Sequence, residues 1–291
     1  MKIAIIGGGA IGLLTASYLA EVGHEMMLFT RMQDQASIIN EQGIERIKKG
    51  SIAKFHMKAE KLTGSSQLND YQVVFVCVKQ YDNAIVLPLL QHYSGKIIFM
   101  QNGYVNLHSL SEWMATKQLY LGIIEHGAVR FELNHVHHHG IGKVRIGGLP
   151  LAPAFELQTS ADFPIEFSDR IIDDMMDKLV INAVINPITA VYKVSNGELL
   201  RRPRLIRLTE QLCQEVCRTL NMSYQEKLEK IRHICNITSE NHSSMLVDIQ
   251  NKRLTEVDVI LGYIAEEARI KQIAVPLIDT FYAQIRALEV R

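Results

Sequence analysis

The sequence has little of what marks several large classes of protein. It contains only four cysteines and seven prolines among 291 residues. The cysteines are too few for a disulfide scaffold at this length and have no Cys-X-X-Cys spacing, so we expect reduced thiols. With 47% hydrophobic and 21% charged residues, the composition excludes a disordered, collagen-like or coiled-coil chain. The length predicts about two globular domains.

Neither sign of charge is in excess, because 31 Lys and Arg residues balance 31 Asp and Glu residues. The chain therefore has no overall basic field that would hold nucleic acid or an anionic membrane surface, and we expect neither as a partner. Long apolar runs are also missing. None approaches the roughly 18 residues of a membrane span, and the opening MKIAII ends too early for a signal peptide. These absences predict a cytoplasmic protein that binds anions only at local sites.

The first residues present a strand, a glycine-rich turn and a helix in direct succession. Residues 2–6 are rich in isoleucine, as in a strand that is buried on both faces. The turn GGGAIG follows, and apolar residues then recur at helical spacing to Val22, where Gly23 can end the helix. Residues 26–30 predict the next strand. Together they form a βαβ unit, the setting in which a GxGxxG motif is specific.

The glycine turn predicts a dinucleotide site. Its spaced glycines permit a tight turn, close approach of the backbone to a pyrophosphate, and packing of the helix on the strand. The first amides of the helix would face the phosphates, aided by the helix dipole. A turn that serves only packing is the alternative. We assign the pyrophosphate contacts to Gly7, Gly8, Gly9, Ala10, Ile11 and Gly12.

The residue after the second strand predicts which dinucleotide binds. A site selective for NAD has a carboxylate there for the ribose hydroxyl, whereas this chain has Arg31 and no carboxylate before Asp34. A guanidinium group can bind the 2′-phosphate through two hydrogen bonds, so we expect NADPH. The alternative is an exposed arginine at a strand end without a ligand.

Alternating strands and helices continue through the first half, and helical periods fill the second. We expect strands at 73–78, 97–100 and 119–124, helices at 81–93 and 107–116, a hairpin at 44–57 appended to the sheet, and a second hairpin at 128–146. Helical spacing runs from Ser168, a candidate N-cap, to Arg286. The sequence thus predicts an α/β protein with a Rossmann-type doubly wound sheet in residues 1–167 and an all-helical domain in residues 168–291.

Several sequence blocks resemble those of the ketopantoate reductases (2-dehydropantoate 2-reductases), and the resemblance covers nearly the whole chain. The blocks are GGGAIG, Val78-Lys79, Gln101-Asn102-Gly103, Lys178-Leu-Val-Ile-Asn-Ala-Val-Ile-Asn-Pro187, Asn196-Gly197-Glu198, Ser243-Ser244-Met245-Leu246 and Thr255-Glu256. The later blocks are more specific than the glycines. The resemblance implies reduction of 2-dehydropantoate to pantoate with NADPH, on the route to pantothenate and coenzyme A.

One of these blocks makes chemical sense by itself. Lys178, Asn182 and Asn186 are four residues apart on a predicted helix and form one polar stripe between apolar neighbours. Buried polar groups need partners, and substrate and cofactor can supply them. Hydride transfer to a ketone leaves a negative oxygen that an ammonium group can stabilise and protonate, so we assign Lys178 as the proton donor. A lysine that extends to water is the alternative. Pro187 predicts a kink beside Asn186.

The resemblance implies the remaining substrate contacts. Asn182, Asn186, Asn196 and Ser244 would bind the substrate together with Lys178 and Asn102. Amides can donate and accept, which suits a molecule with a carboxylate, a ketone and a hydroxyl group. The alternative for the asparagines is hydrogen bonding between helices inside the core.

Further cofactor contacts are implied in the same way. Lys79 and Asn102 follow strands, at the edge where open α/β sheets bind ligands, and Ala128 lies in the matching position after the next strand. These residues could instead be plain loop positions. Glu256 would be catalytic and contact the cofactor or Lys178, where a carboxylate favours the ammonium form. A salt bridge between Glu256 and Arg253 on the helix surface is the alternative.

Three other clusters carry less weight. His135 and His137-His138-His139 suggest a metal site, but neighbouring residues of a strand point to opposite faces, so we expect no metal. Cys213 and Cys217 have no further ligands nearby and are expected to be core thiols. The run Arg201-Arg202-Pro203-Arg204 is expected to be the solvated start of a helix.

Two other functions are compatible with the same residues. One is a related NADPH-dependent reductase of another 2-keto acid, and the other is a protein that senses NADPH without catalysis. The lysine, asparagine and glutamate set argues against sensing, which needs no proton donor. The apolar residues of the C-terminal helices would pack within one chain or against a second copy, so a homodimer stays among the expected partners.

Overall fold

The computed structural model of the chain describes residues 1–101 and 110–289. They divide into two compact units, one made of residues 1–101 and 110–171 and the other of residues 172–289.

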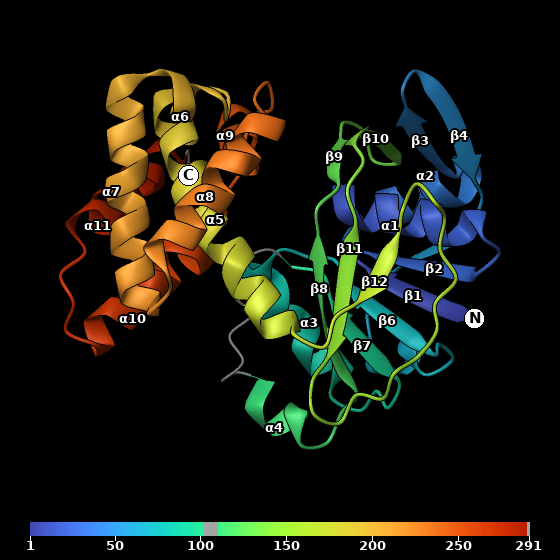
Figure 1. Ribbon diagram of the computed structural model, residues 1–291. Coiled ribbons are helices and arrows are strands. Elements are labelled where there is room, and N and C mark those ends of the chain that lie inside the picture. The colour runs from blue at the N-terminus through green and yellow to red at the C-terminus, as the bar shows by residue number, and fades with distance from the viewer. Residues whose placement is uncertain (102–109, 290–291) are drawn as a thin grey trace. The chain divides into compact units, whose positions relative to one another are not determined.

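The first unit contains an eight-stranded sheet with the strand order β12-β11-β8-β7-β6-β1-β2-β5 (Figure 1). Its parallel strands are β1 (Lys2–Ile6), β2 (Glu25–Thr30), β5 (Lys58–Lys61), β6 (Val73–Val76), β7 (Lys96–Phe99) and β8 (Leu119–Ile124). The chain passes from β1 to β2 and β5 on one side and then returns to β6 on the other. The carboxyl ends of β1 and β6 therefore form the switch point at which doubly wound sheets bind ligands.

Two further strands extend this sheet. β11 (Val144–Gly148) runs antiparallel to β8, and β12 (Ile165–Phe167) runs parallel to β11. The predicted strands of the parallel sheet are confirmed to within two residues at each end, whereas β5 and β12 were not predicted. Both are short edge segments whose alternation of apolar and polar residues is too brief to stand out.

The helices of this unit follow the prediction in part. They are α1 (Ala10–Glu21), α2 (Gln33–Gln42), η1 (Ser65–Leu68), η2 (Gln80–Asp82), α3 (Asn83–Leu90) and α4 (Ser111–Met114). Gly23, with a φ of 90°, ends α1 as expected. The predicted helix at 81–93 is shorter, and the first residues of the one at 107–116 lie outside the described residues. α2 was missed because it is mostly polar and buries only Gln35, Ala36 and Ile39.

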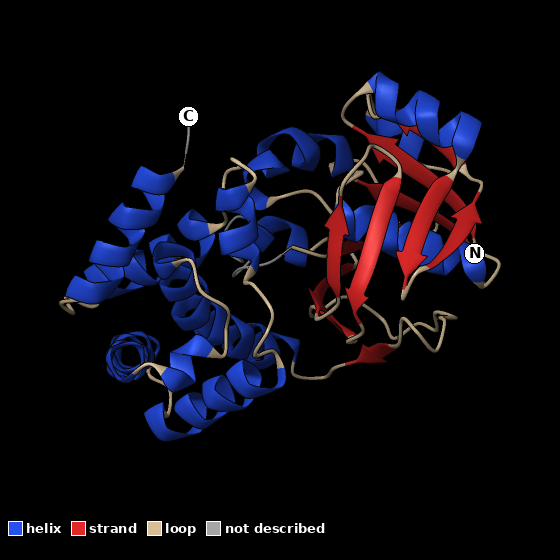
Figure 2. Ribbon diagram, turned by 90° about the horizontal axis from the view of Figure 1, so that it is seen from above, coloured by secondary structure: helices blue, strands red, loops and turns tan. Residues whose placement is uncertain are grey.

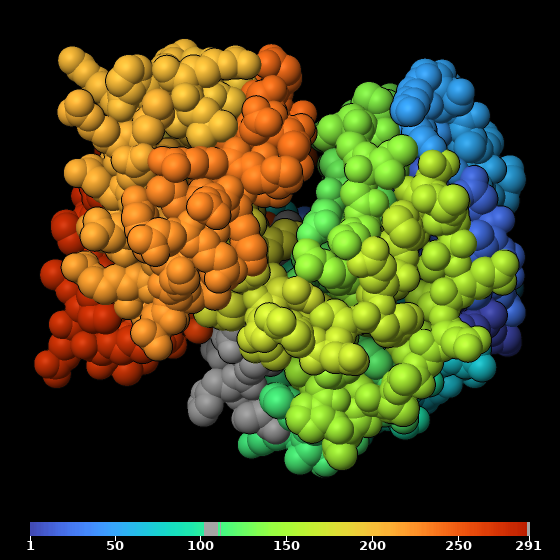
Figure 3. Space-filling view, in the orientation of Figure 1, coloured from blue at the N-terminus to red at the C-terminus, as the bar shows by residue number. Residues whose placement is uncertain are grey.

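A second sheet of four strands has the order β4-β3-β10-β9. It contains β3 (Ile44–Lys48), β4 (Ser51–Phe55), β9 (Gly127–Arg130) and β10 (His135–Gly140). The β3–β4 hairpin turns at Lys49 and Gly50, which both have positive φ, as predicted. It does not extend the large sheet, however, because β5 occupies the edge beside β2. β3 instead pairs with β10 in parallel, so the two segments lie side by side in the space-filling view (Figure 3).

The second predicted hairpin is also only partly right. β9 and β10 pair antiparallel, but residues 144–146 belong to β11 and leave for the large sheet. α1 contacts strands of both sheets and is enclosed between them. Buried Ile44 and Val136 join the same hydrophobic core as β1 and α1, which explains why the small sheet covers this helix.

The second unit is helical throughout its described residues, as predicted, and all described strands lie in the first unit (Figure 2). The helices are α5 (Ile171–Tyr192), α6 (Glu198–Arg201), α7 (Pro203–Leu220), α8 (Tyr224–Ile237), α9 (Ser244–Gln250), the π-helical turn η4 (Asp258–Gly262), α10 (Tyr263–Ile270) and α11 (Pro276–Leu288). Ser168 lies in the turn before α5. Its hydroxyl accepts a hydrogen bond from the amide of Arg170, and α5 begins at Ile171, beyond this turn.

Candidate active site

The glycine turn between β1 and α1 has the geometry of a dinucleotide-binding turn. Gly7 has a φ of 114°, which favours glycine. A Cβ on Gly12 would lie 1.8 Å from the carbonyl oxygen of Gly7, so only glycine allows α1 to start this close to β1. A Cβ on Gly9 would meet nothing within 4 Å. The turn is therefore closed at Gly7 and Gly12 and open at Gly9, the position where the backbone comes close to the pyrophosphate in dinucleotide-binding turns.

The first turn of α1 offers amides that are outside the helical hydrogen bonds of the described residues, beside this open position. Gly9 is the N-cap, no side chain caps the helix, and no acidic residue lies in its first turn. The amide of Leu13 is the first to bond back, to Gly9 at 2.9 Å, which leaves those of Ala10, Ile11 and Gly12 outside the helical ladder. Such amides and the helix dipole suit a phosphate group. The residues present thus fit the pyrophosphate of a dinucleotide.

The carbonyl group of Gly8 is held by two side chains. Its oxygen accepts hydrogen bonds from Gln35 Nε2 and Arg130 Nη1, both at 2.8 Å. Gln35 lies on α2 and Arg130 on β9. Sequence reasoning missed both residues, because no local pattern signals contacts with Gly8 that span 27 positions for Gln35 and 122 positions for Arg130.

Arg31 lies directly after β2, which pairs with β1 so that Phe29 lies beside Ile6. Its side chain is 79% exposed, and Nη1 lies 3.8 Å from Asp82 Oδ1, at the end of η2. Within residues 1–101 and 110–289, the guanidinium group thus takes part in a weak surface ion pair, on the same sheet edge as the glycine turn.

Lys79 lies after β6, the strand on the other side of β1. The chain here is fastened by Gln101, which donates to the carbonyl of Val78 at 3.0 Å and exchanges two hydrogen bonds with the amide of Asn83. Asn102 lies outside the described residues. Ala128 is not at the end of a strand of the large sheet, because β8 ends at Ile124 and Ala128 belongs to β9 of the small sheet. β9 reaches the glycine turn through Arg130.

The polar stripe of α5 forms as predicted. Lys178 and Asn182 are half-buried and Asn186 is 6% exposed, while Leu179, Val180, Ala183, Val184 and Ile185 pack into the core of the helical unit. Within the described part of the chain, neither the Asn182 nor the Asn186 amide hydrogen-bonds to another residue. This arrangement does not match the alternative of helix-to-helix hydrogen bonds. Pro187 lies inside α5, which continues to Tyr192.

Asn196 and Ser244 lie at two ends of helices in the same unit. Asn196 Nδ2 donates to the hydroxyl of Thr238 at 2.9 Å, whereas its buried Oδ1 has no partner among residues 1–101 and 110–289. Ser244 is exposed at the first position of α9, and Ser243 caps that helix. The hydroxyl groups of Ser243 and Thr189 lie 2.7 Å apart, which ties the start of α9 to α5 near Asn186.

Glu256 is 9% exposed and directly precedes the start of a helical segment that includes η4. The side chains of Val257, Ile260, Leu261 and Ile264 are all buried, as predicted. A π-helical turn is rare and is often found at functional sites. Arg253 lies 3.1 Å from Asp248, so its guanidinium group pairs with that carboxylate.

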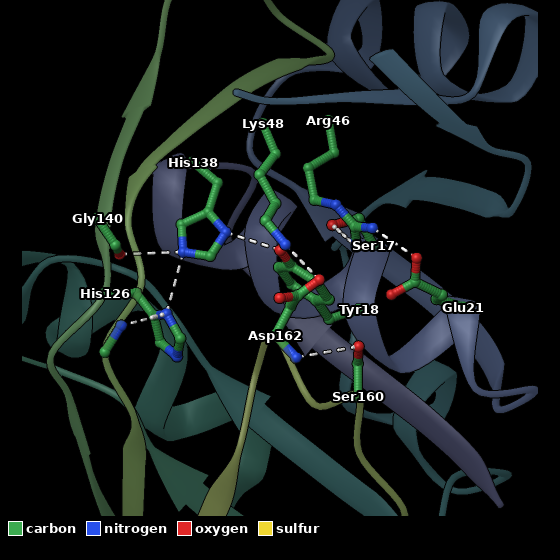
Figure 4. Close-up of polar contacts among 11 residues, drawn as sticks. Ser17, Tyr18, Glu21, Arg46, Lys48, His126, His138, Gly140, Ser160 and Asp162 are labelled. Atoms are coloured by element: carbon green, nitrogen blue, oxygen red, sulfur yellow. Dashed lines mark hydrogen bonds and ion pairs between the residues drawn. The ribbon is translucent and has the colours of Figure 1, made fainter. Parts of the chain in front are cut away.

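A buried polar cluster that the sequence did not predict lies on the inner side of the small sheet (Figure 4). Tyr18 of α1 lies 2.7 Å from His138 Nδ1, and His138 Nε2 lies 3.0 Å from the carbonyl of Gly140 and 3.1 Å from His126 Nδ1. Since a carbonyl only accepts, we assign the hydrogen of His138 to Nε2, and the Tyr18 hydroxyl then donates to Nδ1. Arg46 stacks on the Tyr18 ring with 3.6 Å to its centroid. This cluster fixes α1 to the small sheet.

Burial shifts the titration of these groups. It raises the pKa of Tyr18 to about 12 and lowers the pKa of His126 to about 4, with repulsion from His138 adding to the latter. The amide of Gly142 donates to His126 Nδ1, so the hydrogen of His126 lies on Nε2, a buried atom without a partner in the described residues. Burial lowers the pKa of His138 as well, so both histidines are neutral at neutral pH.

The histidine run, the cysteine pair and the arginine run each lie in an ordinary structural environment. His137 and His139 are exposed on β10 while His138 is buried, and no group of three metal-binding side chains gathers within the described residues. Cys213 and Cys217 are buried core thiols with 3.8 Å between their sulfur atoms. Arg201 and Arg202 form surface ion pairs with Glu198 before α7 begins. Every helix in the described part of the chain is too short or too polar to cross a membrane.

Comparison with known proteins agrees with this geometry. The family model "Ketopantoate reductase PanE/ApbA" matches residues 3–150, and the model of its C-terminal part matches residues 170–289. The 2-dehydropantoate 2-reductase of Bacillus subtilis (strain 168) is 37% identical over 99% of this chain and 98% of its own length. The crystal structure of probable 2-dehydropantoate 2-reductase panE from Bacillus subtilis has a TM-score of 0.90 at 35% identity, covering 99% of this chain and all of that one.

The fold is shared more widely. A D-mandelate dehydrogenase solved with NADH and anilino(oxo)acetate has a TM-score of 0.85 at 21% identity, over 99% of this chain and 98% of that one. At this identity the likeness concerns the fold alone. The two family models and the full-length relative together show that this chain belongs to the ketopantoate reductase family.

Proposed function

We propose that the protein reduces 2-dehydropantoate to pantoate with NADPH, a step in the synthesis of pantothenate and coenzyme A in the cytoplasm. The full-length similarity to a relative named for this activity supports the proposal. The observation that carries it is the stripe on α5, where the Asn182 and Asn186 amides have no partner among the described residues and follow Lys178 along one helix face. Sensing of NADPH without catalysis would not need this stripe.

The residues of the first unit would hold the dinucleotide. The open face at Gly9 and the amides of Ala10 to Gly12 would bind the pyrophosphate, and Arg31 would bind the 2′-phosphate. An exposed cation at this position favours NADPH over NADH, because a phosphate group adds charge that the guanidinium group can neutralise. Gly7, Gly8, Lys79, Asn102 and Ala128 would complete the contacts. When bound, NADPH supplies the hydride.

The residues of the second unit would hold the substrate and the proton. Asn182, Asn186, Asn196 and Ser244 would hydrogen-bond its polar groups, and the buried Oδ1 of Asn196 offers an acceptor that suits a hydroxyl group. The ammonium group of Lys178 would stabilise the oxygen that gains charge and donate its proton to it. The carboxylate of Glu256 would favour the charged form of Lys178.

The test is oxidation of NADPH by purified protein, followed by absorbance, with 2-dehydropantoate and with 2-keto acids that lack its hydroxyl group. We expect the highest kcat/KM with 2-dehydropantoate and a lower one with NADH. A higher kcat/KM for another 2-keto acid would identify a related reductase. Tight binding of NADPH without turnover of any keto acid would indicate a sensor.

A further inference from the structure

We infer that Gln35 and Arg130 are positioning residues for the dinucleotide turn: they fix the Gly8–Gly9 peptide so that the N–H of Gly9 faces the phosphate site. This inference rests on the proposed binding of NADPH. Neither side chain belongs to the glycine motif or to the blocks that carry the family resemblance.

The two donors reach one oxygen from different directions. Gln35 Nε2 and Arg130 Nη1 each lie 2.8 Å from the Gly8 carbonyl oxygen. Gln35 is 5% exposed, and its Nε2 also lies 2.6 Å from the carbonyl of Leu133, in the turn between β9 and β10. The Gly8 carbonyl is thus joined to α2 and to the small sheet at once, which restricts rotation of the peptide more than one hydrogen bond would.

Because the peptide group is planar, holding the Gly8 carbonyl also fixes the direction of the Gly9 N–H. All described peptide bonds are trans, and in a trans peptide the C=O and the following N–H point to opposite sides. With the Gly8 carbonyl turned towards Gln35 and Arg130, the N–H of Gly9 is turned away from them. Gly9 is also the N-cap of α1 and the open position of the turn. Its amide therefore joins those at the start of α1.

The same contacts explain why position 8 is a glycine, although the GxGxxG motif does not require one there. Position 8 is one of the unspecified positions of GxGxxG, yet this chain has glycine there. A Cβ on Gly8 would lie 2.5 Å from Oε1 and 2.6 Å from Nε2 of Gln35. Glycine at this position makes room for the amide that holds its own carbonyl group, so any side chain there would displace Gln35.

Binding of two fragments tests the inference. One probe is 2′-phospho-ADP-ribose, which carries the pyrophosphate and the 2′-phosphate, and the other is 2′-AMP, which carries only the 2′-phosphate. We expect Q35M and R130M to raise the Kd of the first probe about 10-fold, since each removes one hydrogen bond that orients the turn, and to change that of 2′-AMP by less than about twofold. R130K, which keeps a donor, should recover part of the loss.

Control variants distinguish loss of the turn's orientation from a general loss of structure in the first unit. Q42M changes an exposed glutamine on the same helix, and K143M removes a positive charge whose side chain pairs with Glu166, so both should bind the two probes as wild type does. G8A should weaken binding of the larger probe as Q35M does. Because both changes break the same contact, the double variant should be no weaker than about the worse single one. G8A also keeps the test available if Q35M does not fold.

Four outcomes would overturn the inference. Unchanged binding in folded Q35M and R130M would show that the contacts do not orient the turn. A loss confined to R130M, with Q35M and G8A like wild type, would make Arg130 a direct phosphate ligand. An equal loss for both probes would show general damage to the unit. If wild type binds neither probe, the proposed binding of NADPH fails together with this inference. The wild-type measurement therefore distinguishes failure of the proposed function from failure of the inference alone.

Discussion

The carboxylate of Glu289 accepts hydrogen bonds from both the amide and the hydroxyl group of Thr255, at 2.8 and 2.7 Å. The Glu289 side chain is 2% exposed, and Arg286 lies 2.8 Å from its other oxygen. The Thr255 hydroxyl in turn accepts from the amide of Val257 at 3.2 Å. The end of α11 therefore holds the short stretch of backbone that carries Glu256.

We expect E289A to lower the free energy of unfolding by about 2–3 kcal/mol, because it leaves the Thr255 amide buried without an acceptor and Arg286 without this partner. E289Q keeps an oxygen that can accept from Thr255, so it should lose less. Urea unfolding followed by circular dichroism measures both. Equal stability of E289A and wild type would mean that this anchor is not important for the helical unit.

Replacement of the proposed proton donor should affect turnover far more than cofactor binding. We expect K178A to lower kcat at least about 100-fold, the usual scale of a positioned acid, while the Kd for NADPH changes little. K58A removes an exposed lysine from β5 and serves as the matched control. Near-normal turnover of K178A in steady-state assays would reject the assigned role.

The choice between NADPH and NADH should depend on Arg31. R31M removes a charged donor to the 2′-phosphate, worth roughly 1.5–3 kcal/mol, so the KM for NADPH should rise about 10- to 100-fold while the KM for NADH stays the same. D82N removes the carboxylate that lies 3.8 Å from the guanidinium group, and it should lower the KM for NADPH. An equal rise in both KM values for R31M would argue against a contact with the 2′-phosphate.

The buried histidines should make the first unit sensitive to acid. The pKa of His126 is about 4 in the folded protein and about 6.5 in an unfolded chain, so between these values only the unfolded chain binds the proton. Stability is then fully present above pH 6.5 and is lost as the pH falls towards 4, by up to about 3 kcal/mol for this group. Burial lowers the pKa of His138 as well, which adds to the same trend.

Thermal unfolding of wild type and H126N across this pH range checks the prediction. Asparagine keeps an acceptor near the Gly142 amide but does not titrate, so H126N should be less stable at pH 7 and should show a shallower dependence on pH. Parallel curves for the two proteins would show that His126 does not cause the loss in acid.

Local patterns were sufficient for the elements that form the first βαβ unit and for the stripe on α5. The glycine turn, the end of α1 at Gly23 and the burial of Val257, Ile260, Leu261 and Ile264 follow from residues close together in the sequence. The family resemblance added Asn196, Ser244 and Glu256, which no spacing would single out.

Long-range pairing set the limit of the sequence-based prediction. The β3–β4 hairpin was recognised from its own residues, but its place beside β10 depends on a partner about ninety positions away, and His135 contacts Glu45 across that separation. His138 was part of an unexplained run, and only the pairing of β10 decides that it faces inward. Gln35 lies on a polar helix that no apolar periodicity reveals.

The span of 122 residues between Gly8 and Arg130 has a consequence for synthesis of the chain. The glycine motif leaves the ribosome before the strand that fastens it, which follows more than a hundred residues later. A nascent chain that stops before β9 carries the whole motif but lacks one of its two anchors.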